Sequence, residues 1–193
     1  MKRTILTLIT LWLVLWLHAK SDSLHQKFKG VPIDGTRTEF VEKMKLKGFS
    51  FLGTYNNVDT LRGDFAAFKD CLVCVSTLKH KDLVYSITVR FPECDTWSAL
   101  SEDYYSLKGM LTEKYGNPSE TTEMFQNDGL PDDFNKFFFV KSNQCKYYST
   151  FRTHNGTIQL KIDHKGRESC FVSLTYSDSI NCAIIRSHAI DDL

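Results

Sequence analysis

The stretch Tyr85-Ser-Ile-Thr-Val-Arg-Phe91 decides the fold class of this chain. Tyr85, Ile87, Val89 and Phe91 are apolar, and one polar residue stands between each successive two. Successive side chains of a strand point to opposite faces, so this alternation predicts a strand with one core face and one polar face. Such strands are typical of antiparallel sheets whose core face is covered by helices. We expect water or a partner to cover the polar face.

Strand patterns continue on both sides of this stretch. Apolar or alternating runs bounded by short polar turns predict strands at 49–55, 60–65, 71–78 and 83–91, and then at 120–125, 146–153, 157–164 and 169–176. Asn155-Gly156 predicts a hairpin turn with positive φ at both residues. The apolar run Phe137–Val140 is expected either to begin the strand at 146–153 or to pair separately.

Helix signals precede each group of four strands. Thr36 and Glu39 form the pattern of a capping box, and Gly48 supplies a stop for the first helix. A longer helix is predicted at 97–115, capped by Asp95 or Thr96 and ended by Gly116-Asn117-Pro118. A short helix at 180–190 is expected to finish the chain.

A helix followed by four strands thus occurs twice, at a spacing of roughly 60 residues. We predict an α+β fold of two tandem units, each a helix packed on one face of a four-stranded antiparallel sheet, with a short C-terminal helix. The predicted organisation is a signal peptide at 1–19, a polar lead-in at 20–33, a first α+β repeat at 34–93 and a second at 94–193.

The first residues have the features of a secretory signal. Lys2 and Arg3 precede the apolar stretch Ile5–Leu17, and small Ala19 stands before polar residues. A bilayer-spanning helix needs about 20 apolar residues, so this stretch is too short for a permanent membrane anchor. We predict cleavage after about Ala19 and a secreted or periplasmic protein.

Composition excludes several classes of function. The 24 Lys+Arg and 23 Asp+Glu residues nearly balance, so no strong positive field directs the chain toward nucleic acid. The sequence lacks a nucleophile elbow, a phosphate-cradling glycine loop and a dinucleotide fingerprint. We therefore expect no cofactor, and the sequence identifies no catalytic residue and no metal ligand.

Cysteine content favours disulfides if the chain is exported. The candidate disulfide cysteines are Cys71, Cys74, Cys94, Cys145, Cys170 and Cys182, and the sequence leaves their pairing open. Cys71-Leu-Val-Cys74 has the spacing of a redox or zinc site, but it lies in a predicted strand. Strand residues three apart point to opposite faces, so the two thiols are expected to be core thiols or disulfide partners.

Basic and aromatic side chains gather on the predicted polar sheet faces. The candidate binding residues are Thr88, Arg90, Tyr148, Arg152, Lys161 and Phe171. Aromatic residues and arginine are enriched in the buried parts of protein interfaces. The alternative interpretation is a solvated sheet with scattered aromatic residues.

Four segments carry a resemblance to a family of secreted proteins of Bacteroides-type bacteria whose function is uncharacterised. These are Phe28–Thr36, Gly63–Cys71, Leu107–Pro118 and Arg186–Leu193. The family supplies no catalytic motif to carry over. The doubled helix-plus-sheet plan is also similar to β-lactamase-inhibitor-protein-like folds, which implies binding of proteins or cell-envelope components through an exposed sheet.

Three functional hypotheses follow from the sequence. The first is a non-enzymatic module that engages a protein or cell-envelope component through its sheet surface. The second is a cell-envelope hydrolase acting on glycan or peptide with dispersed acidic residues. The third is a structural or assembly component that associates through sheet edges. The sequence does not predict an oligomeric state.

Overall fold

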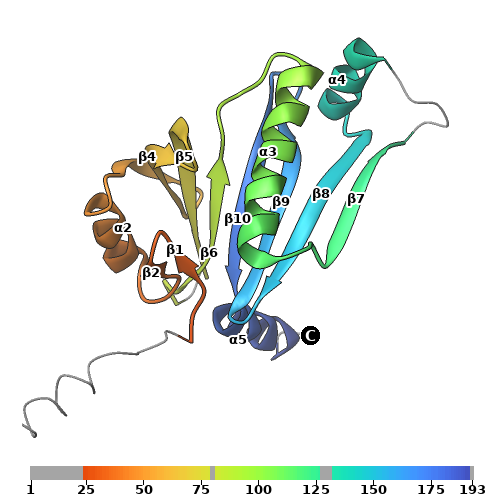
Figure 1. Ribbon diagram of the computed structural model, residues 1–193. Coiled ribbons are helices and arrows are strands. Elements are labelled where there is room, and N and C mark those ends of the chain that lie inside the picture. The colour runs from red at the N-terminus through yellow and green to blue at the C-terminus, as the bar shows by residue number, and fades with distance from the viewer. Residues whose placement is uncertain (1–23, 79–80, 127–131, 192–193) are drawn as a thin grey trace, which may run out of the picture.

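The computed structural model describes residues 24–78, 81–126 and 132–191 of the chain (Figure 1). The predicted signal peptide lies outside these residues. Within them the fold is α+β, with four helices, one large antiparallel sheet and a small sheet formed by β1 (Lys27–Phe28) and β2 (Val31–Pro32). None of the helices in these ranges combines the length and apolar character needed to cross a membrane.

The large sheet contains eight strands in the order β3-β4-β5-β6-β10-β9-β8-β7, and all neighbours are antiparallel. The strands are β3 (Ser50–Tyr55), β4 (Val58–Phe65), β5 (Phe68–Thr77), β6 (Val84–Arg90), β7 (Glu120–Phe125), β8 (Cys145–Thr153), β9 (Gly156–Lys165) and β10 (Ser169–Asp178). The eight strands predicted at 49–55, 60–65, 71–78, 83–91, 120–125, 146–153, 157–164 and 169–176 are present, with small differences in their bounds. The alternation in β6 is confirmed from Ile87 to Phe91, because Ile87, Val89 and Phe91 are buried whereas Thr88 and Arg90 are partly exposed. It is wrong at the start of the strand, where Val84 and Ser86 are buried and Tyr85 is partly exposed, because the pairing with β5 shifts between Ser76 and Thr77.

The two groups of four strands form one sheet, whereas the sequence analysis expected a separate sheet in each unit. The last strand of each group makes the junction, since β6 pairs with β10 over five residue pairs from Arg90↔Ser173 to Ser86↔Ser177. A single hydrophobic core then runs through both groups, from Phe28 and Phe40 to Phe151 and Leu160. Local alternation specifies each strand, but it contains no signal for this long-range pairing.

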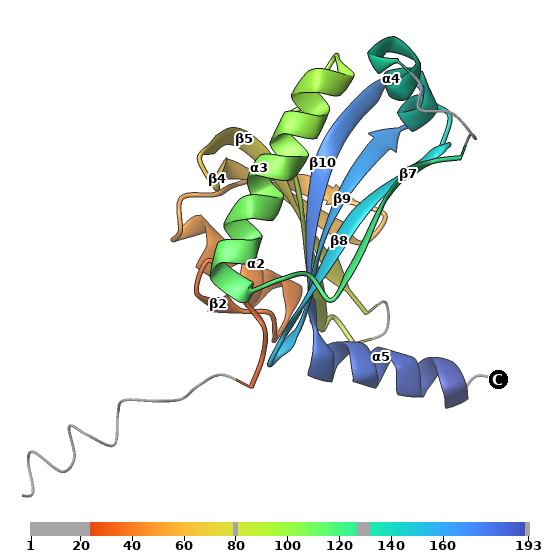
Figure 2. The same cartoon turned by 45° about the vertical axis from the view of Figure 1, so that its right-hand side comes forward.

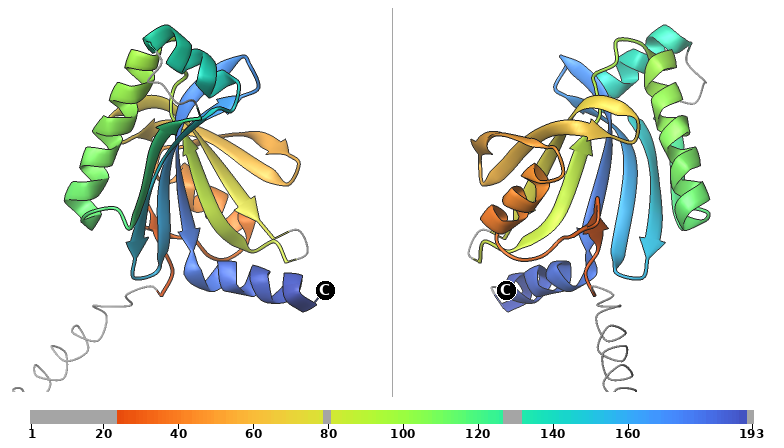
Figure 3. Two further views of the ribbon diagram at one scale, coloured as in Figure 1. Left: turned by 90° about the vertical axis from the view of Figure 1, so that its right-hand side faces the viewer. Right: turned by 60° about the vertical axis from the view of Figure 1, so that its left-hand side comes forward.

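Three helices cover one face of the sheet. They are α2 (Arg37–Lys45), α3 (Trp97–Tyr115) and α4 (Asp133–Lys141). Thr36 and Glu39 form the predicted capping box of α2, and Thr96 caps α3. Figures 1 and 2 show α3 lying along β8, β9 and β10, and Figure 3 shows α2 against the β3–β6 group.

The fourth helix, α5 (Ser179–Asp191), follows directly from β10 and lies across one end of the sheet (Figures 2 and 3). We call the sheet face opposite α2 and α3 the open face. It carries Thr88 and Arg90 of β6 and those residues of the other strands whose side chains point to the same side of the sheet. Helix α5 lies at one end of this face. This is the face that the sequence analysis expected to meet water or a partner.

The prediction that Phe137–Val140 is strand is wrong, because these residues lie in α4. Asp132 accepts a hydrogen bond from the backbone N–H of Asn135 at 2.8 Å and so caps the helix. The helix brings Phe137 and Val140, three positions apart, toward the core. The cap and this spacing outweigh the strand preference of consecutive aromatic residues.

The predicted turn at Asn155-Gly156 is displaced by one residue. Thr153 pairs with Gly156, so the two turn residues are His154 and Asn155, and neither Asn155 nor Gly156 has positive φ. Gly156 is needed for another reason: a Cβ at this position would overlap the carbonyl oxygen of Ser177 on β10. Among the described residues, turns with two positive φ values lie instead at Asn56-Asn57, at 48° and 63°, at Ala66-Ala67, at 50° and 69°, and at Lys29-Gly30, at 48° and 80°.

This close approach predicts that Gly156→Ala destabilises the protein by roughly 1–3 kcal/mol, since the added methyl group must displace the β10 backbone. The matched control is Gly109→Ala on the exposed side of α3, where a Cβ meets nothing within 4 Å. There alanine should stabilise by about 0.5–1 kcal/mol through its helix preference. Urea unfolding followed by circular dichroism measures both. Equal effects of the two substitutions would contradict the packing argument.

Candidate functional site

Strand pairing places four side chains in one row across the open face. Arg90 of β6 stands opposite Ser173 of β10, Ser173 opposite Lys161 of β9, and Lys161 opposite Tyr148 of β8. Directly paired strands are about 4.8 Å apart, so this row covers four adjacent positions. Three candidate residues named from the sequence, Arg90, Lys161 and Tyr148, therefore lie in one row.

The other three candidates lie on neighbouring rows of the same face. Thr88 stands opposite Thr175, and their hydroxyl oxygens are 3.0 Å apart. Arg152 of β8 stands opposite Thr157 and is exposed. Phe171 of β10 is only 5% exposed, so its ring is buried beneath other side chains of this face and is not an exposed aromatic contact.

Arg90 covers the ring of Phe171. The carbon atom at the centre of its guanidinium lies 4.1 Å from the ring centroid of Phe171, which is a cation–π contact. Its Nε is buried and has no hydrogen-bond partner within the described ranges. A buried donor without an acceptor costs free energy. This nitrogen is enclosed, so a ligand would contact the more exposed part of the Arg90 side chain, which is partly exposed.

The open face has an excess of positive charge. Its basic side chains include Arg62, Arg90, Lys146, Arg152, Lys161 and Lys165, and its acidic side chains include Asp64, Glu120 and Asp163. Lys161 Nζ lies 3.3 Å from Asp163 Oδ1, and Glu120 accepts a hydrogen bond of 2.6 Å from the hydroxyl of Tyr148. Within the described part of the chain, the three arginines have no ion pair.

Sequence reasoning missed Arg62, Ser173 and Lys146 as members of this face. The alternation in β4 and β8 contained the signal for Arg62 and Lys146, because each stands between core-facing neighbours. For Ser173, the alternation in β10 indicated the face on which the residue lies. Its place between Arg90 and Lys161 depends on the pairing of β6 with β10.

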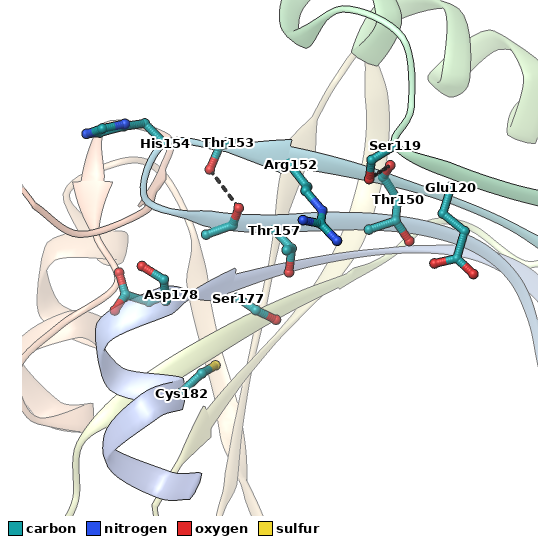
Figure 4. Close-up of a pocket in the computed structure, with 12 residues that line it drawn as sticks. Ser119, Glu120, Thr150, Arg152, Thr153, His154, Thr157, Ser177, Asp178 and Cys182 are labelled. Atoms are coloured by element: carbon teal, nitrogen blue, oxygen red, sulfur yellow. Dashed lines mark hydrogen bonds between the residues drawn. The ribbon is translucent and has the colours of Figure 1, made fainter. Parts of the chain in front are cut away.

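A groove of about 570 Å³ adjoins the row where the open face meets α5 (Figure 4). Its charged or ionisable side chains are Glu120, Arg152, His154 and Asp178, with Cys182 contributed by α5. Hydroxyl groups supply much of the remaining lining, from Ser119, Thr150, Thr153, Thr157, Ser177 and Ser179. Such a lining offers many hydrogen bonds to a polar ligand.

Asp178 serves the fold rather than the groove. Its fully buried carboxylate accepts hydrogen bonds from the backbone N–H groups of Gln26 at 2.7 Å and Asn181 at 2.8 Å. Nδ1 of His25 lies 3.1 Å from the same carboxylate. The amide Nδ2 of Asn181 donates in turn to the carbonyl of Val84 at 2.9 Å. This cluster fastens the amino-terminal segment and α5 to the sheet.

The cysteines are free thiols in the structure. Cys71 is fully buried on the core face of β5, and Cys74 lies on the open face opposite Thr88. The expectation that these two point to opposite faces is confirmed. Across the described ranges, no group of three His, Cys, Asp or Glu side chains is placed to hold a metal ion.

Comparison of the chain with protein-family models, curated proteins and solved structures found no match. The resemblances stated from the sequence therefore stay predictions, and the function is argued from the geometry of the open face.

We predict that Asp178→Asn lowers the free energy of unfolding by roughly 1.5–3 kcal/mol, because one carboxylate oxygen is replaced by an N–H donor among groups that also donate. Guanidinium unfolding measures the change. The control is Asp163→Asn, whose carboxylate is partly exposed beside Lys161 and should contribute less than about 1 kcal/mol. An Asp178→Asn protein as stable as the wild type would contradict the role given to the cluster.

Proposed function

We propose that this protein is a secreted or periplasmic, non-enzymatic binding module that engages an acidic segment of a protein or cell-envelope component through its open face. The observation that carries the proposal is Arg90, whose guanidinium stacks on Phe171 and which has no ion pair among the described residues. Lys161 and Tyr148 continue the same row, and Arg152 extends the positive surface toward the groove.

Charge supports an acidic partner. Three arginines without ion pairs on the described part of one face attract carboxylate or phosphate groups, and arginine binds both through a pair of parallel hydrogen bonds. The whole chain has a formal charge of only +1, so the attraction is local to this face. Local charge of this kind favours selective binding over general adhesion to polyanions.

The hydrolase alternative gains no support from the groove. Its two carboxylates belong to Glu120, which accepts a hydrogen bond from Tyr148, and Asp178, which is buried and accepts from two backbone N–H groups. Glycoside hydrolysis needs a pair of carboxyl groups that both reach the substrate. Asp178 is committed to the fold and does not meet this requirement.

The decisive experiment compares the mature chain with the variant Arg90→Glu/Arg152→Glu/Lys161→Glu in a crosslinking pull-down from cell-envelope extract. We expect the variant to lose its captured partner by about tenfold or more, since like charges now face the acidic segment. Binding of the wild type should also weaken as salt rises.

The matched control is Lys27→Glu/Lys43→Glu/Lys47→Glu, which changes the net charge by the same amount at exposed residues outside the open face. It should retain the partner. Equal loss in both triple variants, or retention in both, would overturn the proposal. Circular dichroism of each variant verifies its fold.

A second candidate function, assembly through a sheet edge, is favoured by β3. This strand is the last one at its end of the sheet, and it exposes Phe51, Leu52 and Tyr55 by 41%, 52% and 78%. An edge strand with unpaired backbone groups and apolar side chains can pair with another copy of itself.

Assembly through β3 predicts that the purified protein dimerises at high concentration and that Leu52→Lys prevents it, because lysine on an edge strand opposes pairing. Size-exclusion chromatography with light scattering measures the mass. The control is Met124→Lys on β7, at the opposite edge of the sheet, a residue that is also 52% exposed. A wild-type protein that remains monomeric up to millimolar concentration would exclude assembly by this route.

We also infer that the two halves are tandem repeats of one plan. In support, each begins with a capped helix, α2 or α3, and continues with four strands of which each pairs with the next. Helix α4 is then an insertion between the first and second strands of the second half.

A further inference from the structure

Two cysteines from distant parts of the sequence are direct backbone partners. Cys94, in the segment between β6 and α3, and Cys170, near the start of β10, form an isolated antiparallel bridge. The backbone N–H of Cys94 donates to the carbonyl of Cys170 at 2.9 Å. Antiparallel partners have Cα atoms about 4.5–5.5 Å apart, inside the range of roughly 4.4–6.8 Å that disulfides span.

Both side chains point to the same side of the sheet. Cys170 is fully buried and shares the core face of β10 with Val172 and Leu174. The thiol of Cys94 reaches toward α3, where it donates to a carboxylate oxygen of Asp103 at 3.4 Å. Both thiols therefore lie between the sheet and the start of α3.

The other four cysteines have no such partner. Cys145 stands opposite Phe125 on β8, and β9 lies between β8 and β10, so Cys145 and Cys170 are separated by about 9–10 Å between strands. Cys71 pairs with Gly63, and Cys74 stands between Thr60 and Thr88. Cys182 lies on α5, near the carbonyl of Tyr85.

We propose that Cys94 and Cys170 form a disulfide when the chain folds under oxidising conditions, and that this disulfide fixes the segment before α3 to β10. The oxidant is a small-molecule disulfide such as oxidised glutathione. The thiolate of Cys94 displaces one glutathione thiolate to form a mixed disulfide, and the thiolate of Cys170 then displaces the second. The two cysteine thiols lose two protons and two electrons, and the oxidant becomes two molecules of reduced glutathione.

The disulfide should form during folding rather than afterwards. Burial in the folded chain raises the pKa of Cys94 to about 12, with a further contribution from the hydrogen bond to Asp103, and burial also raises the pKa of Cys170. Thiolates are the reactive species, so both thiols are poorly reactive once they are enclosed.

The test is to reduce and unfold the full chain, refold it in a glutathione redox buffer and block the remaining thiols with N-ethylmaleimide. We expect four of the six cysteines to be alkylated, and one disulfide that links the tryptic peptides 91–108 and 168–186. The second peptide contains both Cys170 and Cys182, so the mapping is repeated in Cys182→Ser. Thermal unfolding of the oxidised protein should occur about 5–15 °C above that of the reduced protein.

Two matched variants distinguish this pairing from its rivals. Cys94→Ser should keep all five of its thiols and show no difference in Tm between oxidising and reducing conditions. Cys145→Ser should still form the disulfide. The proposal is overturned if Cys170 is linked to Cys145 or Cys182, or if natively folded wild-type protein retains six free thiols after refolding in the redox buffer. The wild-type peptide map decides the matter even if Cys94→Ser fails to fold.

Discussion

Pairing of β6 with β10 is the constraint on which both faces of the sheet depend. It joins two four-stranded groups along their last strands, so residues 86–90 and 173–177 lie at the centre of eight strands. On one side of this pair, Ile87, Val89 and Leu174 belong to the core. On the other side, Arg90 comes to stand beside Ser173. A slip of one residue would exchange the faces and bury the arginine in the core. Burial of the apolar set therefore fixes the register, and the register in turn assembles the row on the open face.

The end of this central pair is held by buried polar groups rather than by apolar packing. Asp178 ends β10, caps α5 and accepts from the amino-terminal segment, while Asn181 reaches the backbone of β6. A buried carboxylate is stable only when its hydrogen bonds are satisfied, and here they come from segments far apart in sequence. The cluster positions α5 beside the open face and thereby forms one wall of the groove that Arg152 and Glu120 also line.

Local signals in the sequence were sufficient for most elements and insufficient for their assembly. Alternation located the eight strands, and hydroxyl and carboxylate caps located α2 and α3, because these effects act over a few residues. The single sheet depends on the pairing of β6 with β10, two strands more than 80 residues apart. A local sequence pattern does not predict which distant strands pair. Gly156 shows the same limit at one residue: its role lies in the approach of Ser177, not in the turn beside it.

The candidate site, like the fold, could be predicted only in part from local patterns. Parity alone placed Thr88, Arg90, Tyr148, Arg152 and Lys161 on the face without α2 and α3, since parity is a property of each strand. Parity also placed Phe171 there, but it could not show that the ring is buried beneath Arg90.

The stacking of Arg90 on Phe171 has a physical reason. A phenylalanine on an uncovered sheet face would be an exposed apolar patch, and a helix packed over it would close the face. Arg90 covers the ring of Phe171 with its guanidinium, and the Arg90 side chain remains partly exposed. The ring is thus shielded without a second layer of helices, by the same side chain on which the proposed binding of an acidic partner depends.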